Sequence, residues 1–118
     1  MVDIEAVVAR LLCEATGVTA YIEVPAKPDD EYVSVEQTGG GDSIFDPVSL
    51  SIDCVAGLPR DGGRKRAKAI SRAVQAAVAG LDEVECIYNP SVDAVYRQND
   101  PDTGRSRYVV DCSMFVCE

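Results

Sequence analysis

The chain contains no histidine among its 118 residues, and this absence excludes several kinds of catalytic and metal site. Without imidazole there is no Ser-His or Cys-His activation of a nucleophile, and the commonest general base near neutral pH is missing. The usual nitrogen ligand of zinc is missing as well. We therefore predict no catalytic residue, no enzyme activity and no cofactor, although carboxylate chemistry stays possible in principle.

Paired cysteines at metal-binding spacing are also lacking. The chain has five cysteines, an odd number, and no two of them form a C-x-x-C motif. Cys112 and Cys117 fall in one predicted strand, five positions apart, so their side chains should point to opposite faces. No secretory signal is recognisable at the N-terminus, where Asp3 and Glu5 belong to an amphipathic pattern. We expect a reducing compartment, mostly buried cysteines and no bound metal.

Positive charge is scarce, since 11 basic residues face 20 acidic ones and leave a net charge of −9. This balance argues against general nucleic-acid binding, which requires cations that displace condensed counterions, and against an anionic membrane surface. No apolar run approaches the roughly 20 residues that span a bilayer. The charge favours solubility or a basic partner instead.

The patterns that are present predict one domain covering residues 1–118. A domain of this size buries about two-thirds of the surface that its unfolded chain exposes, and 47% of the residues are hydrophobic. Apolar residues at helical spacing, with Asp3 as N-cap and Gly17 as the terminating glycine, predict a first helix. The predicted helices are 4–15 and 64–81, and the predicted strands are 18–24, 32–38, 47–56, 84–88, 92–97 and 106–117.

The order α-β-β-β-α-β-β-β predicts an α+β fold with a mostly antiparallel sheet and both helices packed on one face. The last two strands are expected to form a long hairpin. In the final strand, Val109, Phe115 and Cys117 lie opposite the main alternating face. Either helices cover both faces there, or another subunit covers the second one.

Acidic and glycine-rich loops offer weak alternatives for a ligand site. The carboxylates at 29–31 and at Asp100 and Asp102 could form an acid/base pair or bind calcium, but neither loop has a full ligand spacing, so we interpret both as solvated. Gly39, Gly40 and Gly41 join two strands, whereas a phosphate-binding loop leads into a helix. We interpret the triplet as a flexible arm and expect segments 39–44 and 99–104 to be mobile in the free protein.

The most informative feature is a cluster of cations near the start of the second helix. It holds six of the 11 basic residues within 13 positions, and the rest of the chain carries five basic and 20 acidic residues. Positive charge at a helix N-terminus opposes the helix dipole. A solvated helix face and a partner contact both stay open as interpretations. A basic patch on an acidic body fits a heterologous ring contact, and the cluster comprises Arg60, Arg64, Lys65, Arg66, Lys68 and Arg72.

Several short strings occur in a recognisable order along nearly the whole chain. Ile4-Glu5-Ala6 opens the first helix, and residues 31–35 (EYVSV) are similar to a P-Y-V-V-Y strand. Residues 50–56 (LSIDCVA) are similar to V-Q-I-D-C-W-A, with Val55 where an aromatic is common, and an alanine-rich helix follows. Residues 100–108 (DPDTGRSRY) are similar to a D-P-E-T-G…Y hairpin. In this order the strings resemble the tail-completion (tail-terminator, tail-to-head joining) family of siphophages and prophages.

The resemblance implies a specific role. Proteins of that family form a ring, usually hexameric, on the end of the tail tube, stop its polymerisation and present a surface to head-closure or connector proteins. Double-stranded DNA passes through the lumen without specific binding, and an acidic chain suits this passage. The implied location is the head-proximal end of the virion tail, after assembly in the bacterial host cytoplasm, without a membrane. The alternatives are another neck component such as a head-closure protein, or a small-molecule-binding or enzymatic α+β domain.

We expect the contacts between subunits or with partners to lie at three places, namely the basic cluster, the glycine triplet and the turn before the last strand. The predicted interface residues are Arg60, Arg64, Lys65, Arg66, Lys68, Arg72, Gly39, Gly40, Gly41, Asp100, Asp102 and Gly104.

Overall fold

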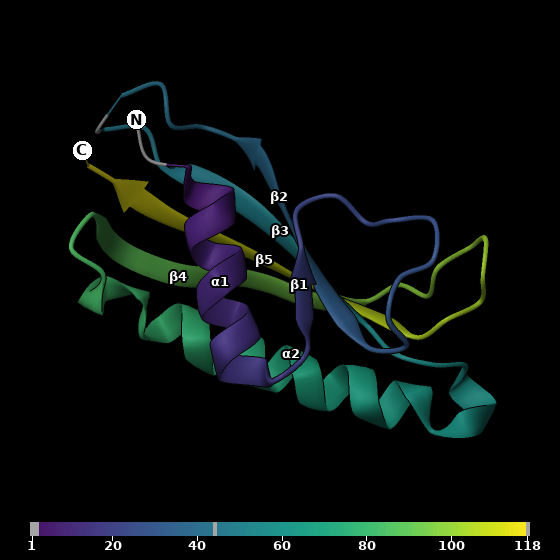
Figure 1. The fold of residues 1–118 in the computed structure, drawn as a ribbon. Coiled ribbons are helices and arrows are strands. Elements are labelled where there is room, and N and C mark those ends of the chain that lie inside the picture. Colours follow the sequence, from purple (N-terminus) through teal and green to yellow (C-terminus); the bar gives the residue numbers. More distant parts are fainter. Residues whose placement is uncertain (1–2, 44, 118) are drawn as a thin grey trace.

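The computed structural model describes residues 3–43 and 45–117 and shows a five-stranded sheet with two helices on one of its faces (Figure 1). Ile44, the last residue of the predicted glycine arm, lies outside the described residues. The predicted α+β class, the mostly antiparallel sheet and the placement of both helices are confirmed. The elements are α1 (Ile4–Thr16), β1 (Thr19–Tyr21), β2 (Tyr32–Gly39), β3 (Val48–Val55), the 3-10 turn η1 (Pro59–Asp61), α2 (Gly63–Ala79), the 3-10 turn η2 (Leu81–Glu83), β4 (Ile87–Arg97) and β5 (Arg107–Val116).

The strands lie in the order β1-β2-β3-β5-β4. Strands β1 and β2 run parallel, and the other neighbours are antiparallel. Strand β5 lies between β3 and β4, so the expected hairpin forms and leaves β4 at one edge of the sheet. The three-residue β1 forms the other edge.

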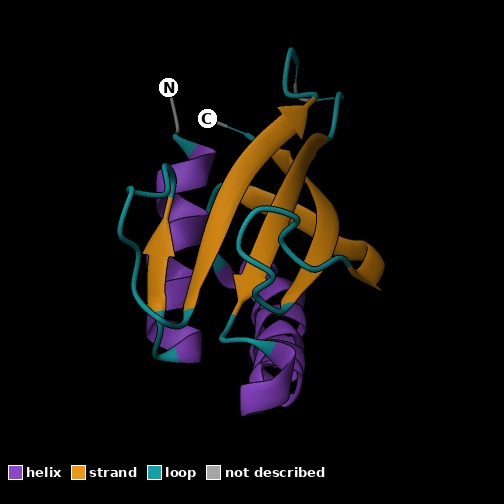
Figure 2. Ribbon diagram, turned by 90° about the vertical axis from the view of Figure 1, so that its right-hand side faces the viewer, coloured by secondary structure: helices purple, strands orange, loops and turns teal. Residues whose placement is uncertain are grey.

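The core lies between the helices and the face of the sheet that they cover (Figure 2). Burial raises the pKa of the Cys54 and Cys112 thiols to about 12, so both stay protonated and behave as small hydrophobic groups. Cys13, in contrast, is exposed. Alternate residues of β3 and one face of α2 supply much of the core: Val48, Leu50, Ile52, Cys54, Ala67, Ile70, Val74 and Val78.

Helix α1 begins and ends as its sequence predicts. The Asp3 carboxylate accepts a hydrogen bond from the backbone N–H of Ala6 at 3.2 Å. Gly17 adopts a left-handed φ of 75°, and its N–H donates to the Cys13 carbonyl at 3.0 Å. Both ends of the helix therefore have partners for backbone groups that the helix itself leaves unpaired.

Strand β4 is one continuous strand of 11 residues, where the sequence predicted two separate strands. Asn89 has a left-handed φ of 50°, Pro90 follows, and the register with β5 shifts between Tyr88 and Ser91. A bulge at the edge of a sheet tolerates proline, because one side of the edge strand makes no ladder hydrogen bonds. Residues 84–86, which were predicted to be in a strand, belong to the turn after η2.

Strand β1 is shorter than the predicted strand at 18–24. It pairs with β2 only from Thr19 to Tyr21, because the chain must then return to begin β2 in the same direction. Ile22 and Val24, which were expected to share its buried side, are 44% and 45% exposed.

Candidate functional site

The predicted interface residues are divided between the two ends of the sheet. At one end of the sheet, where β2 begins, Tyr32 pairs with Val55 and Val55 pairs with Arg107. Three segments therefore meet there: the loop 22–31, the turn 98–106 and the start of α2. We call this the loop end. The glycine triplet lies at the opposite end, where Gly39 pairs with Ser49; we call this the glycine end. Eight strand residues span about 25 Å, so the two groups do not form a single patch.

The basic cluster lies at the loop end and faces solvent. Arg60 belongs to η1, and the other five cations belong to the first ten residues of α2. Because Ala67, Ile70 and Val74 turn the apolar face of α2 toward the core, all six basic side chains are exposed. The helix has no side-chain cap and no acidic residue in its first turn. Its positive N-terminus is therefore left to solvent or to a partner.

Three cations lie near Tyr108. Hydrogen bonding with Arg64 lowers the pKa of Tyr108, and the nearby charges of Lys68 and Arg97 act in the same direction. Arg97 reaches this group from β4, where it pairs with Tyr108 across the strands. The sequence pointed to Arg64 and Lys68 but not to Arg97, because the cross-strand register that brings Arg97 here is not visible in it.

Arg66 differs from its neighbours because it forms an ion pair within the chain. Its guanidinium donates two hydrogen bonds of 2.8 Å to the Glu31 carboxylate, just before β2. This bond holds the pKa of Glu31 below its ordinary value. A partner that used Arg66 would compete with Glu31, and one that used Arg64 would share it with the Tyr108 hydroxyl. Lys65 and Lys68 are the more available cations.

The turn that carries Asp100, Asp102 and Gly104 is closed by its own hydrogen bonds. The Asp100 carboxylate accepts from the N–H groups of Asp102 at 2.9 Å and Thr103 at 3.4 Å, which lowers its pKa. Gly104 has a φ of 74° and donates to the Asp100 carbonyl at 2.8 Å. Asp100 therefore shapes the turn, and Asp102 projects from it as an exposed side chain. Mobility of this turn stays a prediction.

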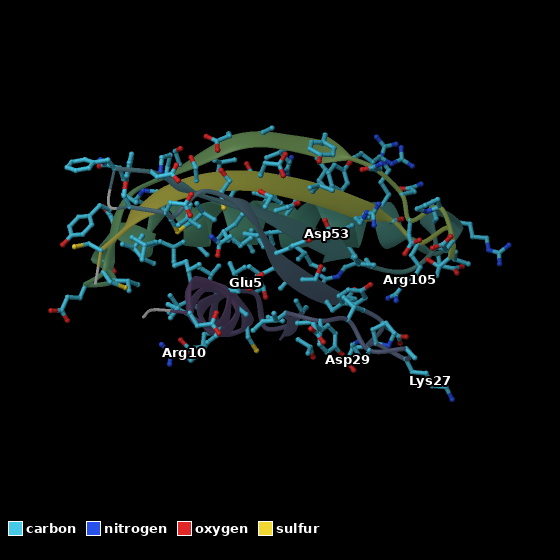
Figure 3. The ribbon with its side chains drawn as sticks, turned by 90° about the horizontal axis from the view of Figure 1, so that it is seen from above. Glu5, Arg10, Lys27, Asp29, Asp53 and Arg105 are labelled. Atoms are coloured by element: carbon cyan, nitrogen blue, oxygen red, sulfur yellow. The ribbon has the colours of Figure 1, made fainter. Side chains whose placement is uncertain are left out.

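Arg105, which the sequence did not single out, joins the loops of the loop end. Its guanidinium donates to the Ala56 carbonyl at 3.1 Å and to the carbonyls of Asp29 and Asp30, and it lies 5.3 Å from the centre of the Tyr32 ring. Figure 3 shows Arg105 and Asp29 at the same end of the molecule. Its hydrogen-bond partners are backbone carbonyls, which every residue has, so no residue type in the sequence indicates this contact. A hollow of about 530 Å³ adjoins this contact and is lined by Asp30, Glu31, Gly57, Leu58, Asp61, Gly63, Arg66 and Arg105.

The glycine triplet forms a compact turn at the glycine end. Gly40 and Gly41 have φ values of 79° and 85°. A side chain on Gly40 would place its Cβ 1.8 Å from the Pro47 carbonyl oxygen, so only glycine fits. The N–H of Gly41 donates to the Asp46 carbonyl at 3.3 Å. The triplet thus has a defined conformation, and its mobility and its contact with a partner stay predictions.

Neither helix covers the second face of the sheet (Figure 2). The strand register places serine and aspartate side chains of β3 and β5 on this face, together with the apolar Val109, Phe115 and Tyr96. A hollow of about 430 Å³ on this face has Ser49, Ser51, Asp93 and Asp111 among its lining residues. Burial raises the pKa of Asp53 on the same face, and the charge of Arg107 partly opposes this shift. Both helices pack on the other face of the sheet (Figure 2), so the first alternative for the final strand, helices on both faces, is wrong. Val109 on the uncovered face is nevertheless only 3% exposed.

Neither a cluster of metal-ligating side chains nor a membrane-spanning helix is found in the part of the chain that the structure describes. In residues 3–43 and 45–117, no three cysteine or carboxylate side chains are gathered so that they could hold a metal ion. No helix in the same part of the chain is both long and apolar enough to cross a bilayer.

The fold and the surfaces define a small α+β domain with a basic helix face and an acidic open sheet. No family model matches the sequence, and no curated protein matches it. The fold is similar to that of a solved chain in the virion of a native gene transfer agent particle, with a TM-score of 0.67 and 22% sequence identity. The similarity covers 94% of this chain and 84% of the other. At this identity, the likeness shows a shared fold.

Proposed function

We propose that this chain is a structural protein of a phage-like virion and, within it, a tail-completion protein that caps the tail tube. The observation that carries the proposal is the likeness of 94% of the chain to a chain in a gene transfer agent virion. The strings that resemble tail-completion proteins, such as residues 50–56 in β3 and residues 100–108 in the final hairpin, support the narrower role.

In this role the chain forms a ring, usually hexameric in the resembled family, on the end of the tail tube. The ring stops tube polymerisation and joins the tail to a head-closure or connector protein. The division of charge supports a contact between copies. The start of α2 is basic and exposed, and the rest of the chain is acidic, so the two surfaces of neighbouring copies carry opposite charge. The chain then acts by assembly without catalysis, at the head-proximal end of the tail.

The acidic open face of the sheet fits the passage of DNA. Its carboxylates include Glu36, Asp53, Asp93 and Asp111, with Arg107 beside Asp53 at 3.9 Å. A surface of this sign does not exchange counterions with DNA phosphates, so it would let DNA move without holding it. We assign this face to the lumen side of the proposed ring.

Electron microscopy of the purified protein with tail tubes and, separately, with head connectors tests the proposal. We expect added density at one end of each tube and no density on connectors that lack a tail. Binding to connectors but not to tube ends would replace tail completion by head closure, which the same virion likeness allows. A chain that binds neither structure would contradict the proposal.

A further inference from the structure

Most of the large hydrophobic side chains that stay exposed belong to the outermost strands of the sheet or follow them directly, and Tyr88 and Tyr96 border its open face. In the described residues there are seven, and only Phe45 lies away from the edges. Ile22 and Val24 follow β1 at one edge. The other four lie on β4 and are 36–52% exposed, namely Tyr88, Val92, Val95 and Tyr96.

The β4 edge has the properties of a surface that a partner covers. The strand is 11 residues long, and in the described sheet it pairs only with β5. A long apolar edge strand promotes unwanted association unless something occupies it. Because the bulge at Asn89 and Pro90 interrupts its free backbone, we expect side chains to dominate the contact.

The two edges carry opposite charge at the loop end. Beside β4 lies the outer face of α2 with Arg64 and Lys68, close to Arg97 at the end of β4 itself. We call β4 with these cations the basic edge.

The other edge is acidic. Beside β1 lies the loop 22–31, which is held there because Thr19 donates to the Asp29 carboxylate and the N–H of Asp29 donates to the Tyr21 hydroxyl at 3.2 Å. The exposed charges of this loop are Glu23, Lys27, Asp29 and Asp30, three acidic and one basic. We call the loop, with Ile22 and Val24, the acidic edge.

We propose that copies of this chain associate side by side in one orientation, with the basic edge of one copy against the acidic edge of the next. The inference rests on the proposed ring and names the surfaces that build it. Such a contact aligns the loop ends of neighbours, so the cations of α2 meet Asp29 and Asp30. It also covers both apolar edges, and a contact between different surfaces can repeat until a ring closes.

The competing arrangement is a two-fold dimer through β4 alone. Antiparallel α2 helices would then set the basic start of one copy against Asp82, Glu83 and Glu85 at the far end of the other. We favour the side-by-side contact because a two-fold dimer leaves Ile22 and Val24 uncovered.

A mixing experiment separates the two arrangements. One variant carries Val92→Ser and Val95→Ser on the basic edge, a second carries Ile22→Ser and Val24→Ser on the acidic edge, and Phe45→Ser is the matched control away from both edges. Sedimentation at up to about 1 mM protein measures association, and circular dichroism checks that each variant is folded. We expect each edge variant alone to associate at least about tenfold more weakly than wild type, because apolar contact area is lost.

Mixing the two edge variants should restore one contact and give a heterodimer, because each supplies the edge that the other lacks. The Phe45→Ser control should associate like wild type. A wild-type protein that is monomeric at about 1 mM would overturn the inference, as would an acidic-edge variant that dimerises fully by itself. Failure of this contact can be told apart from failure of the proposed function. If the edge variants still cap tube ends, only this contact is refuted. If the edges associate but the protein does not bind tail tubes, only tail completion is refuted.

Discussion

Helices α1 and α2 pack apolar faces on the same side of the sheet, but they begin in opposite ways. Helix α1 has a carboxylate cap at Asp3 and a second acidic residue, Glu5, in its first turn. Helix α2 starts after Gly62, which has a left-handed φ of 80° and no capping side chain, and its first turn carries only positive charge. The first arrangement compensates the helix dipole, and the second opposes it.

The difference indicates what holds each helix in place. Local hydrogen bonds stabilise the start of α1. The start of α2 is held by close backbone packing, since a Cβ on Gly63 would lie 1.9 Å from the Gly57 carbonyl oxygen. The cations of α2 take no part in that packing and stay exposed. Three changes at the helix starts, and one at the carboxylate that pairs with Arg66, test this comparison.

The largest effect is expected from Gly63→Ala. The added methyl group would collide with backbone atoms of Gly57 and Leu58, which have no flexible end that could move away. We expect a loss of about 3 kcal/mol or more in the free energy of unfolding, measured by urea denaturation. Gly57→Ala is the matched control, because a Cβ there has no atom within 4 Å. Similar losses in both variants would show that packing at Gly63 does not hold the start of α2.

The next effect is expected from Asp3→Ala, which removes the cap of α1. We expect a loss of about 1 kcal/mol, because the N–H of Ala6 loses its carboxylate partner. Urea denaturation compares the variant with Glu14→Ala, an exposed change on the same helix that should be nearly neutral. A silent Asp3→Ala variant would mean that α1, like α2, depends on packing alone.

A smaller effect is expected from Glu31→Gln, which removes the partner of Arg66. The folded pKa of Glu31 lies below its ordinary value of 4.5. The ion pair therefore stabilises the folded state fully above pH 4.5, and this stabilisation is lost as the pH falls through the folded pKa. Both side chains are partly exposed, so the contribution should stay below about 1 kcal/mol. Unfolding measured from pH 7 to pH 3 should show a weaker pH dependence in the variant than in the wild type. An unchanged slope in Glu31→Gln would contradict the ion pair.

The smallest effect is expected from Lys65→Glu, which gives α2 the charge that α1 already has. We expect a gain of a few tenths of a kcal/mol, because the new carboxylate compensates the dipole. Lys27→Glu in the exposed loop 22–31 is the control and should bring no such gain. Destabilisation by Lys65→Glu would mean that this cation has a partner within its own chain.

The sequence predicts the elements whose signals are local. The cap at Asp3, the left-handed Gly17, the alternation of β3 and the apolar face of α2 all depend on neighbours within a few residues. These predictions are confirmed by the structure.

The missed features depend on distant parts of the chain. Asn89 and Pro90 usually end a strand, and only the edge position of β4 allows the strand to continue through them. Arg105 reaches carbonyls up to 76 positions away, and Arg97 joins Arg64 through the register of β4 with β5. The glycine triplet and the basic cluster are likewise far apart because they lie at opposite ends of the strands β2 and β3. Such placements follow from topology, which local patterns do not specify.

The central claim is that the uncompensated cations at the start of α2 serve assembly. Counting capped tube ends by electron microscopy, with wild type and with the variant Arg64→Glu/Lys65→Glu/Lys68→Glu, tests it most directly. Circular dichroism should show that the variant is folded, because all three side chains are exposed and none contributes to the core. The account predicts that wild type caps most tube ends and that the folded variant caps few. Equal capping by both proteins would contradict the claim and would mean that the basic cluster is only a solvated helix face.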